Sequence, residues 1–341
     1  MAQRSPELLT SLLKEVSRSF YLTMRILPSA IRSQISLAYL LARTTDTIAD
    51  TEIIPVERRL EALERLRARI LGTSNEPLNF GQLTQKQSLP AEKILLERCE
   101  DSSAKLSQFS QEDQQRIRDV LNTIIGGQEL DLKRFVGASE KQIIALQTED
   151  ELDNYTYRVA GCVGEFWTKM CRAHLFPKEK LDEILLMMNG IRFGKGLQLV
   201  NILRDLPRDL RAGRCYIPQE ALIPVGLSPT DLLSPSSQPK FRSVYEKHLN
   251  IAQEHLAAGW NYTNSLPRSQ CKVRLACAWP ILIGARTIQK LRGANIFDPE
   301  QRLKIRRDEV RKLICKSVIL YPFARAWESQ FAAASRISKC C

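Results

Sequence analysis

Two pairs of aspartates are spaced for metal chemistry. Asp46 and Asp50 lie four residues apart, and Asp205 and Asp209 repeat this spacing. On an α-helix, residues four apart project from the same face, with a rise of about 6 Å between them. Mg²⁺ typically bridges one or two such carboxylates to the phosphates of a substrate. One pair alone is also typical of a solvated helix face.

The surroundings of the second pair favour a metal site over a solvated face. Asn201, Asp205 and Asp209 recur every four residues, and Leu197, Leu199, Val200, Ile202 and Leu203 stand between or beside them. Carboxylates on an otherwise apolar helix are costly to bury unless a cation neutralises them. Because the two aspartate segments are far apart in sequence, we expect them to form opposing walls of one cavity, where Mg²⁺ grips a diphosphate and stabilises it as a leaving group.

The elements that must position these residues are helices. Between residues 112 and 131, Ile117, Val120, Leu121, Ile124 and Ile125 mark one helical face. No alternating strand pattern extends beyond a few residues. We therefore expect an all-α fold, a helical bundle around a central cavity with two facing aspartate-rich helices. Residues 1–341 are expected to form a single domain, with a catalytic core at about 11–320.

Charge and composition narrow the class of protein. The net charge of +12 indicates an anionic partner, which could be nucleic acid, an acidic membrane or a phosphorylated substrate. The chain carries no nucleic-acid-binding motif, so we expect no nucleic acid partner. Its longest uncharged apolar stretch, Ala276–Ala285, is too short to span a membrane. Nine cysteines without CxxC spacing favour a reducing compartment, so a cytoplasmic location is expected.

Three further segments accompany the aspartates. Residues 17–20 read SRSF, residues 155–164 read YTYRVAGCVG, and residues 213–220 read GRCYIPQE. With the two aspartate motifs, in this order and at these distances, the sequence resembles the squalene and phytoene synthase family from about Ser17 to Ile314. Among the members of that family it is most similar to squalene synthases.

The resemblance implies an isoprenoid synthase fold and a two-step reaction. Two farnesyl diphosphates would condense head to head to presqualene diphosphate, and NADPH would then reduce this product to squalene. Asp46, Asp50, Asp205 and Asp209 would hold Mg²⁺, which helps diphosphate to leave. The residues implied in diphosphate binding are Ser17, Arg18, Arg43, Gln198, Asn201, Arg204 and Arg214.

The resemblance also implies catalytic and cofactor-binding residues. Tyr155, Tyr39 and Arg43 would be catalytic, with Tyr155 assisting the proton loss that closes the cyclopropane of presqualene diphosphate. A basic segment, Lys304-Ile-Arg306-Arg307, is similar to the NADPH-binding region of squalene synthases. Lys304 and Arg306 would neutralise cofactor phosphates. The charged face of a surface helix is the alternative for this segment.

Three positions depart from the family pattern. Eukaryotic squalene synthases usually carry acidic residues where this chain has Ala49, Thr51 and Arg208. These differences affect the expected number and tightness of bound metals. The three histidines, His174, His248 and His255, stand in no ligand spacing, and we assign them no catalysis.

Several functions remain open at this point. The enzyme could stop at presqualene diphosphate, make hydroxysqualene or dehydrosqualene, or form phytoene from geranylgeranyl diphosphate. A non-catalytic assembly factor on membranes, with basic faces binding lipid headgroups, is the alternative from another class. For the enzyme, an apolar product implies peripheral membrane contact at product release.

Overall fold

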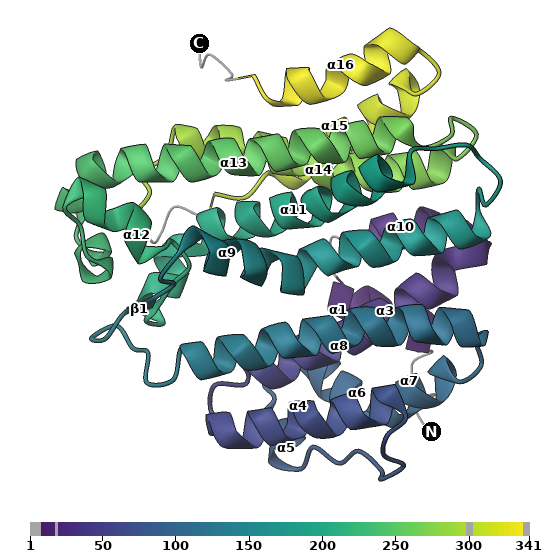
Figure 1. Ribbon diagram of the computed structural model, residues 1–341, viewed down its shortest axis with the longest axis horizontal. Helices are drawn as coiled ribbons and strands as arrows, with labels where there is room; N and C mark the ends of the chain where they lie inside the picture. Colours follow the sequence, from purple (N-terminus) through teal and green to yellow (C-terminus); the bar gives the residue numbers. More distant parts are fainter. Residues whose placement is uncertain (1–7, 18–19, 298–302, 337–341) are drawn as a thin grey trace. The chain divides into compact units, whose positions relative to one another are not determined.

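The computed structural model describes residues 8–17, 20–297 and 303–336 (Figure 1). Helices make up nearly all of the regular structure in these ranges, which confirms the all-α prediction. None of the helices described is both long and apolar enough to cross a membrane. The chain divides into two compact units, residues 1–136 with 166–177 (unit 1) and residues 137–165 with 178–341 (unit 2). The single-domain organisation stays a prediction.

Unit 1 holds the first aspartate pair. Its elements are η1 (Leu8–Leu12, a π-helix), α1 (Leu13–Ser17), α2 (Phe20–Ile26), α3 (Ser29–Asp50), α4 (Val56–Leu71), α5 (Gln82–Lys86), α6 (Pro90–Glu97), α7 (Cys99–Leu106) and α8 (Gln111–Arg134). Helix α10 (Cys162–His174) begins in unit 2 and contributes its later residues to unit 1.

Local sequence signals explain two of the helices that pack against α3. Helix α8 begins after Ser110, whose Oγ accepts the backbone N–H of Asp113 at 3.2 Å. Ile117 and Leu121 of α8 are fully buried, as the periodicity predicts, and α8 packs on α3 and α4. Helix α4 ends at Gly72, whose φ of 77° is the left-handed conformation that favours glycine.

Unit 2 holds the second aspartate pair. It contains the first residues of α10, with α9 (Glu149–Thr156), η2 (Tyr157–Gly161, a π-helix), α11 (Glu183–Arg211), α12 (Gln219–Leu222), α13 (Gln238–Ser265), α14 (Cys271–Arg292), α15 (Arg307–Leu320) and α16 (Ala324–Ala334). Three short 3-10 helices also belong to it: η3 (Ile223–Val225), η4 (Pro229–Leu233) and η5 (Pro235–Ser237). Two short strands, β1 (Ile144–Ala145) and β2 (Arg214–Cys215), pair in parallel.

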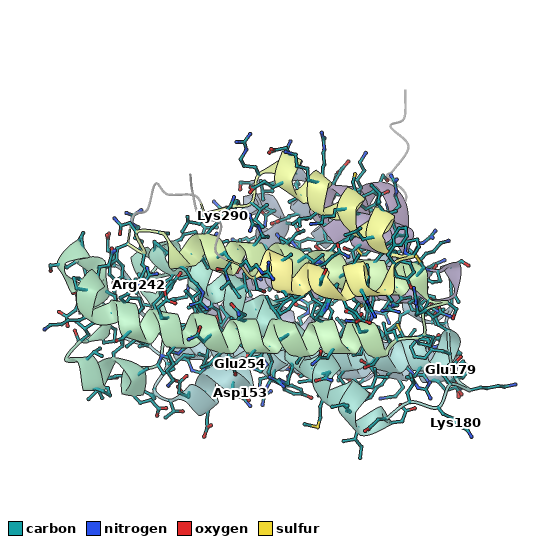
Figure 2. All side chains as sticks on the ribbon, turned by 90° about the horizontal axis from the view of Figure 1, so that it is seen from above. Asp153, Glu179, Lys180, Arg242, Glu254 and Lys290 are labelled. Atoms are coloured by element: carbon teal, nitrogen blue, oxygen red, sulfur yellow. The ribbon has the colours of Figure 1, made fainter. Side chains whose placement is uncertain are left out.

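The core of unit 2 forms where α11, α13 and α14 pack together. Helix α11 lies along α13, and α14 contacts both (Figure 1). Figure 2 shows Arg242 on α13 and Lys290 on the neighbouring α14. Leu203 and Leu206 of α11 are buried, and so is Leu256 of α13. This packing fixes the helix that carries Asp205 and Asp209.

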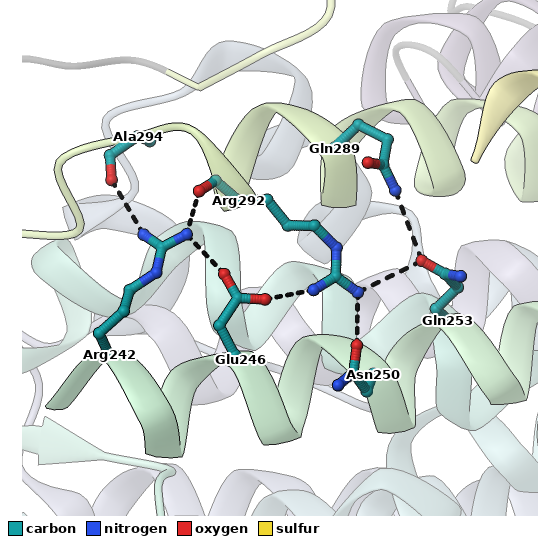
Figure 3. Close-up of polar contacts among 7 residues, drawn as sticks. All are labelled: Arg242, Glu246, Asn250, Gln253, Gln289, Arg292 and Ala294. Atoms are coloured by element: carbon teal, nitrogen blue, oxygen red, sulfur yellow. Dashed lines mark hydrogen bonds and ion pairs between the residues drawn. The ribbon is translucent and has the colours of Figure 1, made fainter. Parts of the chain in front are cut away.

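A polar network joins α13 to the C-terminal end of α14 (Figure 3). The Glu246 carboxylate forms ion pairs with Arg242 and Arg292. Arg292 also donates to Oδ1 of Asn250 at 2.6 Å. Arg242 donates to the backbone carbonyl of Arg292 and, at 3.4 Å, to that of Ala294. The last carbonyls of a helix lack partners within it, so Arg242 satisfies groups that α14 cannot.

Two glycines allow α11 to approach the segment that precedes it in unit 2. A Cβ at Gly194 would lie 2.1 Å from the carbonyl oxygen of Ala160 in η2, and a Cβ at Gly164 would lie 1.9 Å from that of Gly190. Backbone atoms cannot yield as a flexible side chain can. Gly164, the last residue of the YTYRVAGCVG segment, therefore permits this contact because it has no side chain.

We predict that Gly194→Ala lowers the free energy of unfolding by about 2 kcal/mol or more, because overpacking against a backbone carbonyl outweighs alanine's helix propensity. Gly284→Ala is the matched control. The nearest atoms to its Cβ would all be side-chain methyl groups that can move, the closest being Cδ1 of Leu256 at 2.9 Å. Urea unfolding of both variants checks the prediction. Equal effects would show that the backbone contact is not the cause.

Candidate active site

The first aspartate pair lies in the last turns of α3, within a group of charged and polar side chains. Nη1 of Arg43 is 3.8 Å from Oδ2 of Asp46, and Arg43 forms an ion pair with Glu92 of α6. Nε2 of Gln128, on α8, donates to Oδ1 of Asp46 at 2.5 Å. Asp50 is exposed at the end of the helix. Three helices of unit 1 thus position this carboxylate pair.

The electrostatics of this group suit a bound cation. Burial, followed by the charge of Asp50, raises the pKa of Asp46 to about 7, against an opposing effect of Arg43. The Asp46 side chain nevertheless keeps 40% of its surface accessible, so a ligand can reach it. A cation would relieve the repulsion between the two carboxylates.

Tyr39 lies on α3, one turn before Arg43 and close enough to interact with it electrostatically, whereas Ser17 lies at the end of α1. Tyr39 is half-buried and packs on an apolar cluster that includes Leu12 and Leu40. Ser17 is buried, and its Oγ has no hydrogen-bond partner among the residues described. A buried hydroxyl without a partner fits a ligand oxygen. Arg18, predicted beside it, lies outside the described residues.

The second aspartate pair lies near the C-terminal end of α11 in unit 2. Arg204 makes a bidentate contact with its neighbour Asp205, from Nε to Oδ1 at 2.8 Å and from Nη2 to Oδ2 at 2.6 Å. This hydrogen bonding raises the pKa of Arg204. Asn201 donates to Oε1 of Gln198 at 3.5 Å. With Asp209, these side chains are half-buried, as the sequence pattern predicts.

Tyr155 lies in α9, directly before the π-helix η2. It is buried and stacks on Tyr216, with ring centroids 4.7 Å apart. The neighbouring Tyr157 donates its hydroxyl to Oε2 of Glu165 at 3.0 Å, and burial raises the pKa of Tyr157 to about 12. π-Helical turns are frequent at functional sites. Arg214 is half-buried in β2 and stands two residues before Tyr216 in the sequence.

The predicted cofactor residues Lys304 and Arg306 lie in the extended segment before α15. Both are exposed. Nε of Arg306 contacts Oδ1 of Asp308 at 3.1 Å, an exposed ion pair of the kind that contributes little to stability. Such a pair can be exchanged for a phosphate, so the two residues fit the predicted role, which stays a prediction.

Their surroundings explain two of the three departures from the family pattern. Ala49 is buried, so a carboxylate could not replace it without a large penalty. The hydroxyl of Thr51 is buried too and donates to the carbonyl of Thr47 at 2.6 Å. Arg208 is 81% exposed, with Nη2 at 3.8 Å from Oδ1 of Asp209. In this chain, the first two positions are structural.

The donor set fits Mg²⁺ in chemical type. Carboxylate oxygens are the ligands that Mg²⁺ prefers, and each unit supplies one pair of them one helical turn apart. In the part of the chain that is described, no three His, Cys, Asp or Glu side chains gather as a metal-binding group. The convergence of the two pairs on one metal cluster stays a prediction from the sequence.

The sequence analysis missed two residues beside the first pair, Gln128 and Glu92. Gln128 had a detectable signal, because it continues the buried stripe that runs through Leu121 and Ile124 at helical spacing. A polar residue in such a stripe indicates a buried polar contact. Glu92 had none, because it stands in a short helix of eight residues whose partners the local pattern does not indicate.

The histidines have partners that are consistent with structural roles. Nε2 of His174 lies 2.8 Å from Oδ1 of Asp113, which is buried in unit 1. In unit 2, His248 is buried and contacts Glu149 at 3.2 Å. Burial lowers the pKa of His255 to about 4.

We predict that Asp46→Asn stabilises the metal-free protein at about pH 8 by roughly 1 kcal/mol, a gain limited by solvent screening of the partly exposed side chain. The pKa of Asp46 is raised from 3.8 to about 7. Stability is therefore lost as pH rises through this interval, and asparagine carries no charge to lose it.

Urea unfolding with a chelator at about pH 8 and at about pH 4 measures the effect, which should be near zero at the lower pH. The control is Asp119→Asn, at an exposed position on α8. An equal gain at both pH values would show that the Asp46 charge is not responsible.

Comparison with known proteins places the chain in a family. The model for squalene/phytoene synthase matches residues 13–309. A presqualene diphosphate synthase from Rhodopseudomonas palustris is 30% identical over 254 residues, 74% of this chain and 77% of the relative. A phytoene synthase from Arthrospira platensis is 27% identical over 280 residues, 74% and 76% of the two chains. A ligand-bound TcSQS structure shares the fold, with a TM-score of 0.71, 21% identity and 96% coverage of both chains. The chain therefore belongs to the squalene/phytoene synthase family, whose members are prenyltransferase-type enzymes of isoprenoid biosynthesis that act on prenyl diphosphates.

Proposed function

We propose that this protein condenses two farnesyl diphosphates head to head and forms presqualene diphosphate. The observation that carries the proposal is the carboxylate pair at the end of α3, where the pKa of Asp46 is raised to about 7 beside Asp50 and Arg43. A divalent cation would stabilise two neighbouring carboxylates of this kind. The reaction also needs a divalent cation at its leaving group. The curated relatives named presqualene diphosphate synthase support the choice of product.

The side chains of each unit have separate tasks in this proposal. Asp46 and Asp50 in unit 1, and Asp205 and Asp209 in unit 2, would hold Mg²⁺, which supplies positive charge to the departing diphosphate. Arg43 adds a fixed cation on the same helix face as Asp46. The hydroxyl of Ser17 donates to a diphosphate oxygen.

On α11, the donors available to the diphosphate are the guanidinium of Arg204 and the amides of Gln198 and Asn201. Arg204 leaves its bidentate contact with Asp205 as the diphosphate arrives, and the aspartate becomes available as a ligand. Once these donors are in place on the bound diphosphate, they reduce the barrier because they need no further reorientation as charge develops. Arg214 on β2 completes the predicted set.

We propose that Tyr155 assists the loss of the proton that is released when the cyclopropane closes. Its ring is buried against Tyr216, and this fixes its position and limits the access of water. Exclusion of water matters because an allylic cation reacts with any nucleophile that reaches it. Tyr39 and Arg43 are the other proposed catalytic residues.

Reduction of presqualene diphosphate to squalene by NADPH is the second candidate step. The observation that favours it is the exposure of Lys304 and Arg306, which leaves both cations accessible to cofactor phosphates. Formation of phytoene from geranylgeranyl diphosphate is the alternative supported by the phytoene synthase relatives. We propose a cytoplasmic enzyme that contacts the membrane peripherally when its apolar product leaves.

Alanine at Asp46 or at Asp205 is expected to reduce turnover of farnesyl diphosphate about 100-fold or more, because each removes a ligand of the proposed cation. Steady-state assays with Mg²⁺ measure the loss, and circular dichroism checks that the helices remain. Asp119→Ala in unit 1 and Glu179→Ala in unit 2 are matched controls at exposed positions. Loss of activity in the controls, or its retention in either test variant, would contradict the metal role.

A product analysis separates the candidate reactions. The purified protein is incubated with farnesyl diphosphate and Mg²⁺, with and without NADPH, and the products are identified by mass spectrometry. We expect presqualene diphosphate without the cofactor and squalene with it. Identical products under both conditions would exclude the reductive step, and no turnover under either condition would exclude farnesyl diphosphate as the substrate.

A further inference from the structure

A cavity of about 310 Å³ lies among the last helices of unit 2. It is formed by α14, α15, α16 and the segment before α15. The residues that line it are Leu282, Arg286, Ile305, Glu309, Lys312, Leu313, Lys316, Gln330, Ala333 and Ala334. None of them is an aspartate or a diphosphate-binding residue of the proposed reaction. Its size falls at the lower end of the range for small-molecule sites.

The lining carries an excess of positive charge. Arg286, Lys312 and Lys316 face a single carboxylate, that of Glu309. Glu309 is already engaged, since its Oε2 accepts from Nζ of Lys290 at 2.6 Å. Neither Lys312 nor Lys316 makes a hydrogen bond or an ion pair with a described residue. The lining therefore bears two net positive charges, which an anionic ligand would neutralise.

One buried donor in the lining lacks a partner. Gln330 of α16 is only 5% exposed, and its Nε2 atom is fully buried without a hydrogen-bond partner among the residues described. Leaving such a donor unpaired is costly, so a native structure that retains one calls for an explanation. A ligand oxygen in the cavity would accept this hydrogen bond.

The remaining walls are apolar. Leu282 and Ala334 are almost completely buried, and Ile305 and Leu313 are half-buried. No lining residue is aromatic, so nothing in the cavity offers a stacking surface to a nucleobase. The neighbours of Ile305, Lys304 and Arg306, do not line it, as expected when successive residues of an extended segment point in opposite directions.

We propose that this cavity is a binding site for a phosphate or diphosphate group carried on a short apolar chain. A phosphate monoester carries a charge of about −1.5 to −2 at neutral pH, which matches the lining, whereas a carboxylate would leave it positive. The oxygens accept from Lys312, Lys316, Arg286 and Gln330. The apolar part lies on the leucine and alanine wall. The ligand is either a free phosphorylated metabolite or the headgroup of an anionic lipid.

Binding to the full chain, measured without Mg²⁺, tests the proposal independently of the proposed condensation. Inorganic diphosphate is titrated calorimetrically in the presence of a chelator. The test variant is Lys312→Gln with Lys316→Gln, and the matched control is Lys180→Gln with Lys272→Gln, two exposed lysines of the same unit. We expect the test variant to bind at least about tenfold more weakly than wild type and the control to stay within about twofold.

A sedimentation assay with phosphatidylcholine vesicles, with and without phosphatidic acid, distinguishes the two sources of the phosphate. Binding of free diphosphate alone that depends on Lys312 and Lys316 identifies a soluble ligand. Binding to phosphatidic acid vesicles that depends on the same lysines identifies a lipid headgroup. Absence of both, or equal losses in the test and control variants, overturns the proposal.

Gln330→Leu provides a second measurement that does not remove a charge. Leucine eliminates the buried unpaired donor, so the unliganded variant should melt at a higher temperature than wild type while its affinity for inorganic diphosphate falls. A lower melting temperature together with unchanged affinity would overturn the role of Gln330 as a ligand donor.

Discussion

The structure depends on placing carboxylates on helices whose other faces are buried. In α3, Asp46 follows Thr44 and Thr45 and precedes Thr47 and Ile48, all of them buried, so its helix cannot rotate to release it into water. Protein groups compensate only partly for this position. Arg43 and Gln128 contact Asp46, but burial and the negative charges of Asp50 and Glu92 outweigh them and raise its pKa to about 7. A site with this residual cost is prepared for a cation, because the cation removes a penalty that the folded protein otherwise bears.

At the second aspartate pair, a neighbouring arginine compensates the charge of the half-buried carboxylate. Arg204 neutralises Asp205 from the adjacent position, with two short hydrogen bonds, so α11 carries its own counter-ion. This arrangement requires α11 to stay closely packed where Leu203 and Leu206 are buried. The glycine contacts with η2 and the long contact with α13 supply that packing. Stability and site geometry are therefore linked in unit 2, since the residues that bring backbones together also hold the polar stripe in place.

Helical periodicity predicted the fold class and several helices because it reports burial directly, as Ile117 and Leu121 in α8 show. The half-buried stripe on α11 was likewise predictable, since polar residues recur at the helical repeat among leucines. Contacts between elements were not. The ion pair of Arg43 with Glu92 joins residues 49 positions apart, and no local pattern encodes it. The cavity at Gln330 could not be predicted either. The sequence of α16 is that of an ordinary amphipathic helix, and it does not show that the amide of Gln330 lacks a partner.

The positive side chains of the protein are paired with carboxylates in some parts of the molecule and not in others. Around both aspartate pairs, arginines are engaged by carboxylates, so their charge is largely spent before any ligand arrives. On α15, Lys312 and Lys316 have no such partner among the described residues. Lys312 interacts electrostatically with the exposed Asp308, but neither lysine is held in an ion pair, so both can attract an anion that reaches them. The carboxylates of the predicted active site therefore attract a cation, whereas the lysines of α15 attract an anion. A phosphorylated ligand at α15 would reduce the repulsion that the unliganded protein retains.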